Sequence, residues 1–356
     1  MMRLVPGTTL AIAAFLVLSW TESAIGADTP KPLFASVDVI NLTISGPING
    51  ISRADAAKPV PGVLKVQGSA PEMLPIELST RGSSRKLQET CAFPPLRVEF
   101  TTKPGPASLF KGQKRLKLVT HCQPFDKYQQ DVFLEYAAYR LYQALTPESF
   151  NVRLAKIDYT SQNAHPIITR YGFFIEDIDD VAQRNGQVRL RGTSHIASSQ
   201  IDPESGARFA LFQYMISNLD WAMTASQAGE DNCCHNSRLI GAKGATTGLI
   251  NVPYDFDLSG LVDAPYAVPP VGIKVPNVRV RRYRGFCAHN EQAQAVAAAL
   301  APRRASLLAI LDETPQLGEG YRKRADAYLG DFFDEIASAA KLAEVLKTCL
   351  RPVGPQ

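Results

Sequence analysis

The 356-residue chain lacks several patterns that would mark a specialised architecture. It has no internal repeat, no heptad pattern and no long low-complexity tract, which excludes solenoids, coiled coils and compositionally biased tails. Its net charge of +4 is mild for this length, so we expect no nucleic-acid partner. Beyond the N-terminus no stretch is apolar enough to span a bilayer, so we expect no stable membrane span in the mature protein.

The beginning of the chain has the pattern of a cleavable secretory signal. Arg3 supplies a positive charge, residues 10–20 form an apolar run, and small residues follow at 24–27. The run is shorter than the roughly 20 residues that span a bilayer, which favours cleavage near residues 26–27 over an uncleaved anchor. We therefore expect residues 1–27 to be a signal peptide and the mature protein to be secreted or periplasmic.

Export changes the expected role of the six cysteines, because thiols in an oxidising compartment tend to pair. Cys91 and Cys122 flank neighbouring predicted strands and are candidates for one disulfide. Two more bridges are expected among the remaining four, in a pairing that the spacing does not fix: Cys233, Cys234, Cys287 and Cys349.

A rival interpretation of the same segments is a zinc site, which would make the protein a zinc-dependent hydrolase. Its ligands would be Cys233, Cys234, His235, Cys287 and His289. An adjacent Cys-Cys-His and a Cys-x-His do not match the spacing of structural zinc sites, so we favour disulfides.

Short alternating segments separated by turn residues fill the first half of the chain. They predict strands over residues 37–44, 62–67, 74–78, 96–100, 115–120, 152–159 and 167–175. Within this half, apolar residues at three- and four-residue spacings predict one amphipathic helix over residues 128–145.

The second half is predicted to be mostly helical. Helices are expected over residues 203–217, with Asp202 as N-cap, over 291–311 and over 321–346, with a loop-rich section between the first two. This order predicts an α+β protein in which a small antiparallel β lobe precedes a larger helical lobe. The expected parts are an N-terminal strand and linker (28–60), a β-rich lobe with one helix (61–178) and a helical lobe (179–356).

Polar residues capable of chemistry concentrate after the first helix of the second half. Asp220 follows that helix, Asn236 comes later, and Asp255 and Asp257 follow a short apolar strand. Phosphoryl transfer needs one carboxylate to orient the acceptor hydroxyl. It also needs oxygen ligands for magnesium, which an amide and further carboxylates supply.

Several segments resemble motifs of the protein-kinase-like superfamily and, within it, of the spore-coat CotH kinase family. They are the Arg-Gly-Ser-Ser-Arg turn at 81–85, the strand and helix pieces 116–118 and 135–142, the segment 171–179, and the Asp motifs at 218–220 and 254–257. The resemblance runs over residues 81–266, roughly half of the chain. It implies a two-lobe kinase-like fold with Mg²⁺ and ATP as cofactors bound between the lobes.

The resemblance also implies roles for residues of the first half. Arg81, Gly82 and Ser83 would approach the nucleotide phosphates through the turn. Lys117 would contact phosphates while pairing with Glu135, although Lys114 or Arg115 could replace it. Glu176 would lie in the interlobe hinge beside the adenine.

In the second half, Asp220 would orient or deprotonate the acceptor hydroxyl. Asn236 and Asp255 would bind magnesium, with Asp257 as a reserve ligand. Asn236 lies farther from Asp220 than the kinase pattern requires, and Asn232 is a rival for its role.

Two functions are therefore expected. The first is a kinase that transfers the γ-phosphoryl group of ATP to a hydroxyl on an unknown protein or small molecule. The alternative is a catalytically inactive kinase-like binding or structural module of the cell envelope, favoured by the unusual Asp-to-Asn spacing and by the scarcity of ATP outside the cytoplasm. A basic cluster is interpreted as a solvated face and is not assigned to the site: Arg279, Arg281, Arg282 and Arg284.

Overall fold

The computed structural model describes Met1 and residues 29–51, 58–68, 71–82, 85, 87, 89–226 and 232–351. The predicted signal peptide, its cleavage position and Ser83 therefore lie outside the described residues, and these predictions remain untested.

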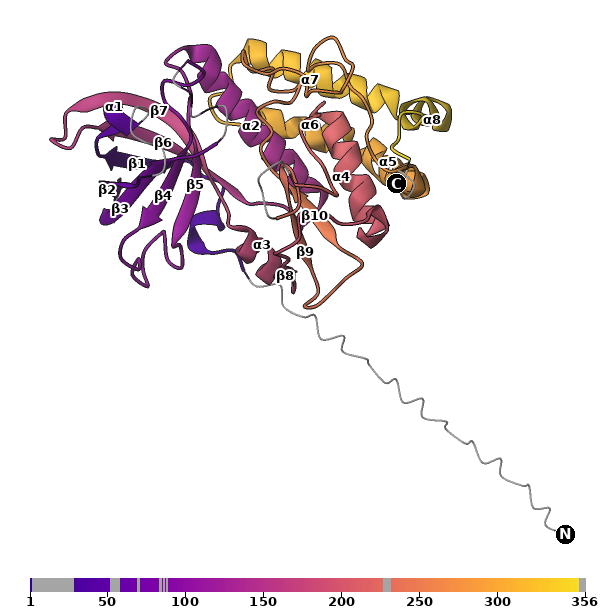
Figure 1. Ribbon diagram of the computed structural model, residues 1–356, viewed down its shortest axis with the longest axis horizontal. Coiled ribbons are helices and arrows are strands. Elements are labelled where there is room, and N and C mark those ends of the chain that lie inside the picture. Colours follow the sequence, from indigo (N-terminus) through magenta and orange to yellow (C-terminus); the bar gives the residue numbers. More distant parts are fainter. Residues whose placement is uncertain are drawn as a thin grey trace.

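The strands of the first half form one closed barrel in the order β1-β2-β3-β4-β5-β7-β6. Alternate side chains of these strands point inwards and form an apolar core that includes Leu42, Leu118 and Phe174. Figure 1 shows the barrel as the indigo and purple part of the molecule. The strands are β1 (Ile40–Ser45), β2 (Val60–Val66), β3 (Glu72–Thr80), β4 (Leu96–Phe100), β5 (Arg115–Val119), β6 (Val152–Thr160) and β7 (Pro166–Ile175).

The predicted fold class, a two-lobe kinase-like fold with a small antiparallel sheet, is wrong. β1 pairs with β2 in antiparallel fashion and with β6 in parallel, from Ile40 opposite Ala155 to Ser45 opposite Thr160. This second pairing joins the two ends of the sheet and gives a closed, mixed barrel of seven strands. Residues 28–60, expected as a strand and linker extension, thus include a strand of the barrel itself.

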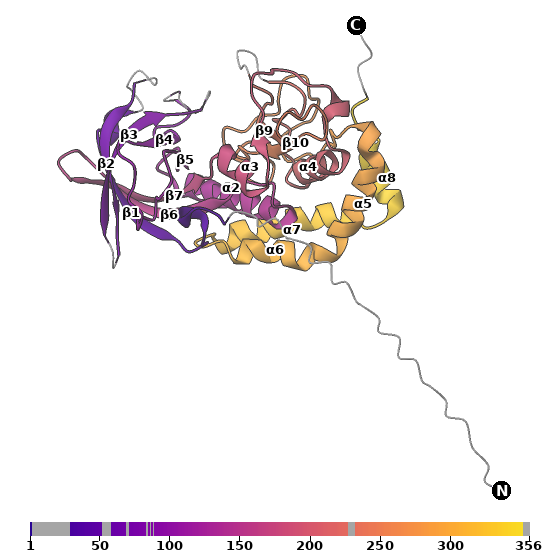
Figure 2. The ribbon, with the colours of Figure 1, turned by 90° about the horizontal axis from the view of Figure 1, so that it is seen from below.

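The helix α2 (Asp126–Leu145) comes between β5 and β6 in the chain and, in space, lies between the barrel and the helices of the second half. It packs on β6 and β7 on one side and on α6 on the other, and it begins two residues before the predicted start. In Figure 2 the barrel lies on the left, α4, α5 and α8 lie on the right, and α2 lies between them. The other helices are α1 (Ile48–Ile51), α3 (Ile178–Arg184), α4 (Pro203–Met215), α5 (Asn290–Leu300), α6 (Arg304–Asp312), α7 (Glu319–Glu335) and α8 (Ala339–Leu346).

The helix ends follow local chemistry. The predicted N-cap of α4 is confirmed, because the Asp202 carboxylate accepts a hydrogen bond of 2.8 Å from the Ser205 amide. The two long C-terminal helices predicted from sequence are each divided. A 3₁₀ turn at Ala301–Arg303, which contains a proline, separates α5 from α6. Ser338 caps the start of α8 and separates it from α7.

A second, three-stranded sheet lies within the section predicted to be loop-rich. Its order is β10-β9-β8, with strands β8 (Val188–Arg189), β9 (Ser237–Gly241) and β10 (Ile250–Pro253). The apolar strand predicted before Asp255 is β10, whereas β9 was not anticipated.

The helical run Cys287–Asp312 has a mean hydropathy of 1.2 over its most apolar window and is long and apolar enough to cross a membrane by length and composition. This contrasts with the expectation that no such stretch would be found. The run includes α5, the 3₁₀ turn and α6. Such a run does not by itself define a membrane span, because core helices of soluble proteins can have the same length and apolar composition.

All six cysteines form disulfides, which confirms the prediction of three bridges. Cys91 pairs with Cys122 as expected, Cys287 pairs with Cys349, and the neighbours Cys233 and Cys234 pair with each other. Three disulfides indicate that the protein folds in an oxidising environment. They also leave no thiolate for the rival zinc site.

The closest backbone approach in the barrel generates a stability prediction. A Cβ atom on Gly172 in β7 would lie 2.5 Å from the carbonyl oxygen of Val119 in β5. We expect Gly172→Ala to lower the free energy of unfolding by about 1–3 kcal/mol, because the strands would have to move apart. Gly105→Ala, where a Cβ would meet nothing within 4 Å, should change it by less than about 0.5 kcal/mol. Urea unfolding compares the two, and equal losses would contradict the prediction.

A buried histidine generates a pH prediction. His121 is 2% exposed, its ring lies 4.6 Å from that of Phe93, and its Nδ1 has no hydrogen-bond partner. Burial, with a smaller effect of Arg170, lowers the pKa of His121 from 6.5 to about 3. Between these values the unfolded chain binds the proton and the native protein does not, so stability falls as the pH drops from about 6.5 towards about 3.

We expect His121→Phe to reduce this slope by up to about 1.4 kcal/mol per pH unit. The exposed His165 offers the matched control His165→Phe. Urea unfolding over this pH range measures the slopes, and parallel curves for wild type and His121→Phe would disprove the assignment.

Candidate functional site

Three carboxylates converge at the junction between α2 and the segment after β10. They belong to Glu135, Asp255 and Asp257, and one oxygen from each lies within 4.8 Å of the other two. Glu135 is 2% exposed, and its Oε1 has no hydrogen-bond partner. Hard divalent cations such as Mg²⁺ take this kind of all-oxygen ligand set. The donor chemistry and the unpaired buried oxygen therefore fit such a cation.

Arg85 supplies positive charge to this acid cluster (Glu135, Asp255 and Asp257). Its Nη2 lies 2.6 Å from Oδ1 of Asp255 and 3.3 Å from Oδ1 of Asp257. The side chains of Arg85 and Asp257 are 8% and 7% exposed, whereas that of Asp255 is 29% exposed. The cluster is thus open to solvent mainly on the side of Asp255.

The pKa shifts follow from burial and charge. Burial raises the pKa of Glu135 well above its ordinary value, with a further contribution from Asp257. Burial likewise raises the pKa of Asp257 to about 6 against the opposing effect of Arg85. Burial also acts to raise the pKa of Asp255, but Arg85, Arg81 and Lys117 outweigh it and the net shift is downwards. The most exposed member of the cluster is therefore the one most readily ionised.

The backbone places Asp255 in a restricted conformation. Its φ of 66° lies in the left-handed region, which Asp tolerates better than most residues. Its amide donates a 2.9 Å hydrogen bond to Oη of Tyr139 on α2. The Tyr139 ring packs 4.6 Å from the ring of Phe256. One helix thus supplies Glu135 and, one turn later, the residue that positions Asp255.

Asp220 lies in a second polar group beside the acid cluster. Its Oδ1 is 2.9 Å from Nε2 of His235, and its Oδ2 accepts a 2.9 Å hydrogen bond from Nδ2 of Asn236. The same amide donates to the backbone oxygen of Asp220 at 2.7 Å. The charge of Asp220 also makes a small contribution to the raised pKa of Asp257. Its carboxylate is therefore held in one orientation near the acid cluster.

The disulfide Cys233–Cys234 immediately precedes His235 and Asn236. Both cysteines are buried, at 2% and 0% exposure. This bridge fixes the chain next to the two residues that hold Asp220. The rival magnesium ligand Asn232 has its amide oxygen engaged, because it accepts a 3.0 Å hydrogen bond from the Gly192 amide.

The structure brings Lys117 and Arg81 near the acid cluster but does not form the expected Lys117–Glu135 ion pair. Among the ion pairs of the described residues none involves Glu135, and Arg85 pairs with Asp255 and Asp257 instead. Lys117 Nζ lies 4.4 Å from the centre of the Tyr254 ring. Gly82 has φ of 95°, which favours glycine.

Glu176 is placed at the end of β7, beside Lys117 in the sheet, where Ile175 pairs with Lys117. Its Oε2 lies 3.2 Å from Nη2 of Arg184 and accepts a 2.9 Å hydrogen bond from the Asn151 amide, and its Oε1 accepts a 3.3 Å hydrogen bond from Nε of Arg184. Both oxygens therefore have protein partners, and the predicted role of Glu176 beside an adenine remains a prediction.

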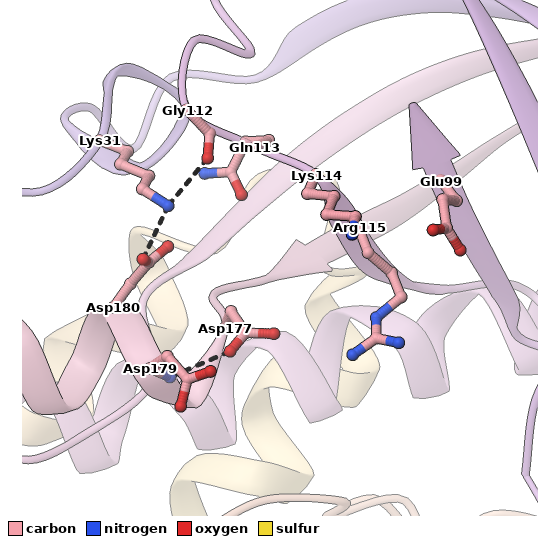
Figure 3. Close-up of a pocket in the computed structure, with 9 residues that line it drawn as sticks. All are labelled: Lys31, Glu99, Gly112, Gln113, Lys114, Arg115, Asp177, Asp179 and Asp180. Atoms are coloured by element: carbon pink, nitrogen blue, oxygen red, sulfur yellow. Dashed lines mark hydrogen bonds and ion pairs between the residues drawn. The ribbon is translucent and has the colours of Figure 1, made fainter. Parts of the chain in front are cut away.

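Lys114 and Arg115, the rivals of Lys117, line a separate pocket with a cavity volume of about 280 Å³. Figure 3 shows their side chains with Glu99 and with Asp177, Asp179 and Asp180 at the start of α3. Lys31 closes one side of this pocket through a 2.7 Å ion pair with Asp180 and a 2.9 Å hydrogen bond to the Gly112 carbonyl. Lys117 is therefore the predicted lysine that approaches the acid cluster.

Most of the predicted basic face is structural rather than solvated. Arg279 and Arg281 stack on the Tyr328 ring. Arg284 stacks on Trp221 and donates hydrogen bonds to the carbonyls of Leu219 and Trp221, which flank Asp220. Arg282 is exposed.

Sequence reasoning missed two residues of the site, Arg85 and His235. Arg85 ends the Arg-Gly-Ser-Ser-Arg turn, which was noted for its glycine and backbone amides only. His235 directly precedes the predicted magnesium ligand Asn236 in the sequence. This adjacency was the signal that could have assigned His235 to the same site.

Comparison with known proteins gives no family assignment: no protein-family model matches the chain, and no curated protein matches it. The resemblance to kinase motifs therefore remains a prediction from the residues alone.

Removing the arginine tests how the acid cluster is neutralised. We expect Arg85→Gln to lower the free energy of unfolding by about 3–5 kcal/mol in metal-free buffer, because buried carboxylates lose their counter-charge. Arg191→Gln breaks an ion pair with Asp179 whose side chains are 59% and 54% exposed, and it should cost less than about 1 kcal/mol.

Manganese added to the Arg85→Gln variant should raise its melting temperature more than that of the wild type, because the cation replaces the guanidinium. Equal losses in the two variants, with no difference in the response to manganese, would refute this account of the cluster.

Proposed function

We propose that the protein is a secreted or periplasmic enzyme that transfers the γ-phosphoryl group of ATP to a hydroxyl group on a protein or small molecule. The observation that carries the proposal is the acid cluster, in which a buried carboxylate oxygen of Glu135 faces two aspartates without a partner of its own. The oriented carboxylate of Asp220, whose charge contributes to the raised pKa of Asp257, supports it further.

Each residue has a role that its surroundings permit. Asp255, Asp257 and Glu135 would hold Mg²⁺, which when bound neutralises the charge of the nucleotide phosphates. Arg81 and Lys117 would attract those phosphates. Asp220, held by His235 and Asn236, would accept a hydrogen bond from the acceptor hydroxyl and take its proton.

Export is proposed from two independent features. The N-terminal segment has the composition of a signal peptide, and the three disulfides agree with an oxidising compartment outside the cytoplasm.

A second candidate function, a binding module of the cell envelope without transfer activity, is favoured by Arg85. Its guanidinium already neutralises Asp255 and Asp257. A cluster with an internal counter-ion is stable without a metal ion, so the same carboxylates could serve only to hold Arg85 and its turn in place.

Melting temperatures with and without Mg-ATP separate the two functions. A ligand at about 100 times its dissociation constant adds roughly 2.7 kcal/mol of stability. We expect a magnesium-dependent upward shift in the wild type and no shift in Asp255→Asn. Asp220→Asn should keep the shift but lose the release or transfer of labelled phosphate from ATP, because binding and chemistry use different carboxylates.

The exposed Asp331 provides the matched control Asp331→Asn, which should behave as the wild type. Absence of any shift at millimolar Mg-ATP would eliminate the enzyme and leave the binding module. A shift with no phosphate released from ATP under any tested condition would show nucleotide binding without transfer.

A further inference from the structure

Two cationic side chains stack on a single aromatic ring at the edge of the acid cluster. The ring belongs to Tyr254, which is 7% exposed and directly precedes Asp255. Nζ of Lys117 lies 4.4 Å from its centroid and Cζ of Arg238 lies 4.7 Å from it. Lys117 comes from β5 of the barrel and Arg238 from β9 of the small sheet. Two separate parts of the fold thus bring their cations to one ring.

Arg238 is fixed in orientation. Its Nη1 donates hydrogen bonds to the backbone oxygens of Ser237, at 2.8 Å, and Cys234, at 3.2 Å. In β9 it pairs with Val252 of β10, two residues before Tyr254. The hydrogen bonds found for Arg238 in the described part of the chain use Nη1 alone. The rest of its planar fork is therefore available to an oxygen ligand of the bidentate kind that guanidinium groups favour.

Several cations in this region form no ion pair within the described ranges. Among the ion pairs of residues 29–351 that the structure describes, none involves Lys117, Arg238 or Arg81. Burial lowers the pKa of Lys117 well below its ordinary value, and Arg81 and Arg238 lower it further. Lys117 and Arg238 stack on one ring without a carboxylate partner among the residues described, an arrangement that a multivalent anion would stabilise.

We propose that Lys117 and Arg238 form a cradle at Tyr254 for the phosphate chain of a nucleoside triphosphate, with Arg81 as a further cation and Arg238 as its specificity residue. The proposal rests on the proposed function and assigns to it a residue that no motif indicated. Three separate cations suit a chain of linked phosphates better than a single phosphate. Asp255 follows Tyr254 directly, so a chain bound here ends beside the carboxylates that would hold the magnesium ion.

The cradle is tested without metal, so that it does not depend on the acid cluster. Isothermal titration of the full chain with sodium tripolyphosphate, in low salt and EDTA, should show binding at least about tenfold tighter than that of orthophosphate. Arg238→Gln should weaken tripolyphosphate binding by about tenfold, because it removes a charge-assisted fork. Arg238→Lys should recover part of the loss, since it restores the charge without the fork.

Arg282→Gln is the matched control, because it removes the same charge from an exposed arginine. It should leave tripolyphosphate binding within about twofold of the wild type. Melting temperatures without ligand show whether each variant is folded. Absence of tripolyphosphate binding in the wild type, or equal weakening by Arg238→Gln and Arg282→Gln, would overturn the cradle.

Mg-ATP and Mg-AMP then distinguish a nucleotide from a free polyphosphate. A melting shift with Mg-ATP that falls in Arg238→Gln, with little shift for Mg-AMP, supports the cradle as a nucleotide site. Tripolyphosphate binding through Arg238 without any Mg-ATP shift would keep an anion site and overturn both its nucleotide assignment and the proposed function. A Mg-ATP shift that is unchanged in Arg238→Gln would overturn the cradle alone.

Discussion

Three carboxylates within 4.8 Å of one another, two of them buried, impose the constraint around which this molecule is arranged. Like charges at this distance in a poorly hydrated site cannot all be ionised unless a cation is present. Arg85 meets part of that need through Asp255 and Asp257, while an oxygen of Glu135 has no partner. The protein thus carries both an internal counter-ion and an open position for an external one. Competition between the two separates an enzyme from a binding module.

Each part of the fold contributes different charged or supporting side chains to this cluster. The barrel supplies cations from β5 and from the turn after β3, and α2 supplies Glu135 and Tyr139. The segment after β10 supplies the two aspartates in a strained, aromatic-supported turn. The small sheet supplies Arg238 and the loop that holds Asp220. A defect in any one of these elements therefore changes the charge balance of the whole site.

Local features were largely predictable from sequence, because they depend on nearby residues. Alternation marked most of the barrel strands, an N-cap marked the start of α4, and even cysteine number in a chain expected to be exported marked the disulfides. Asp255 and Asp257 were found because they directly follow an apolar strand. Helix breaks were missed where one proline or one serine acts against an otherwise continuous pattern, at Pro302 and Ser338.

What could not be predicted depends on contacts between distant residues. Nothing in the residues of β1 indicates that its partner in space is β6, so a small antiparallel sheet was expected and the parallel pairing that closes the barrel was not. Arg85 was overlooked because its role exists only once residues 170 positions away in sequence are beside it. Lys117 was expected to pair with Glu135, but it stacks on the ring of Tyr254. That contact could not be predicted because Tyr254 comes from the other half of the chain.

The parallel pairing of β1 with β6 also has a consequence for the order in which the molecule can assemble. β1 is near the beginning of the chain, yet Ser45 and its hydrogen-bonded partner Thr160 are 115 residues apart. Until β6 has emerged, one edge of β1 is unpaired and able to pair with other strands. Closing so long a loop is slow compared with forming hairpins. The barrel must therefore close late, and the nascent chain must keep its first strand from pairing wrongly until most of the first half has been made.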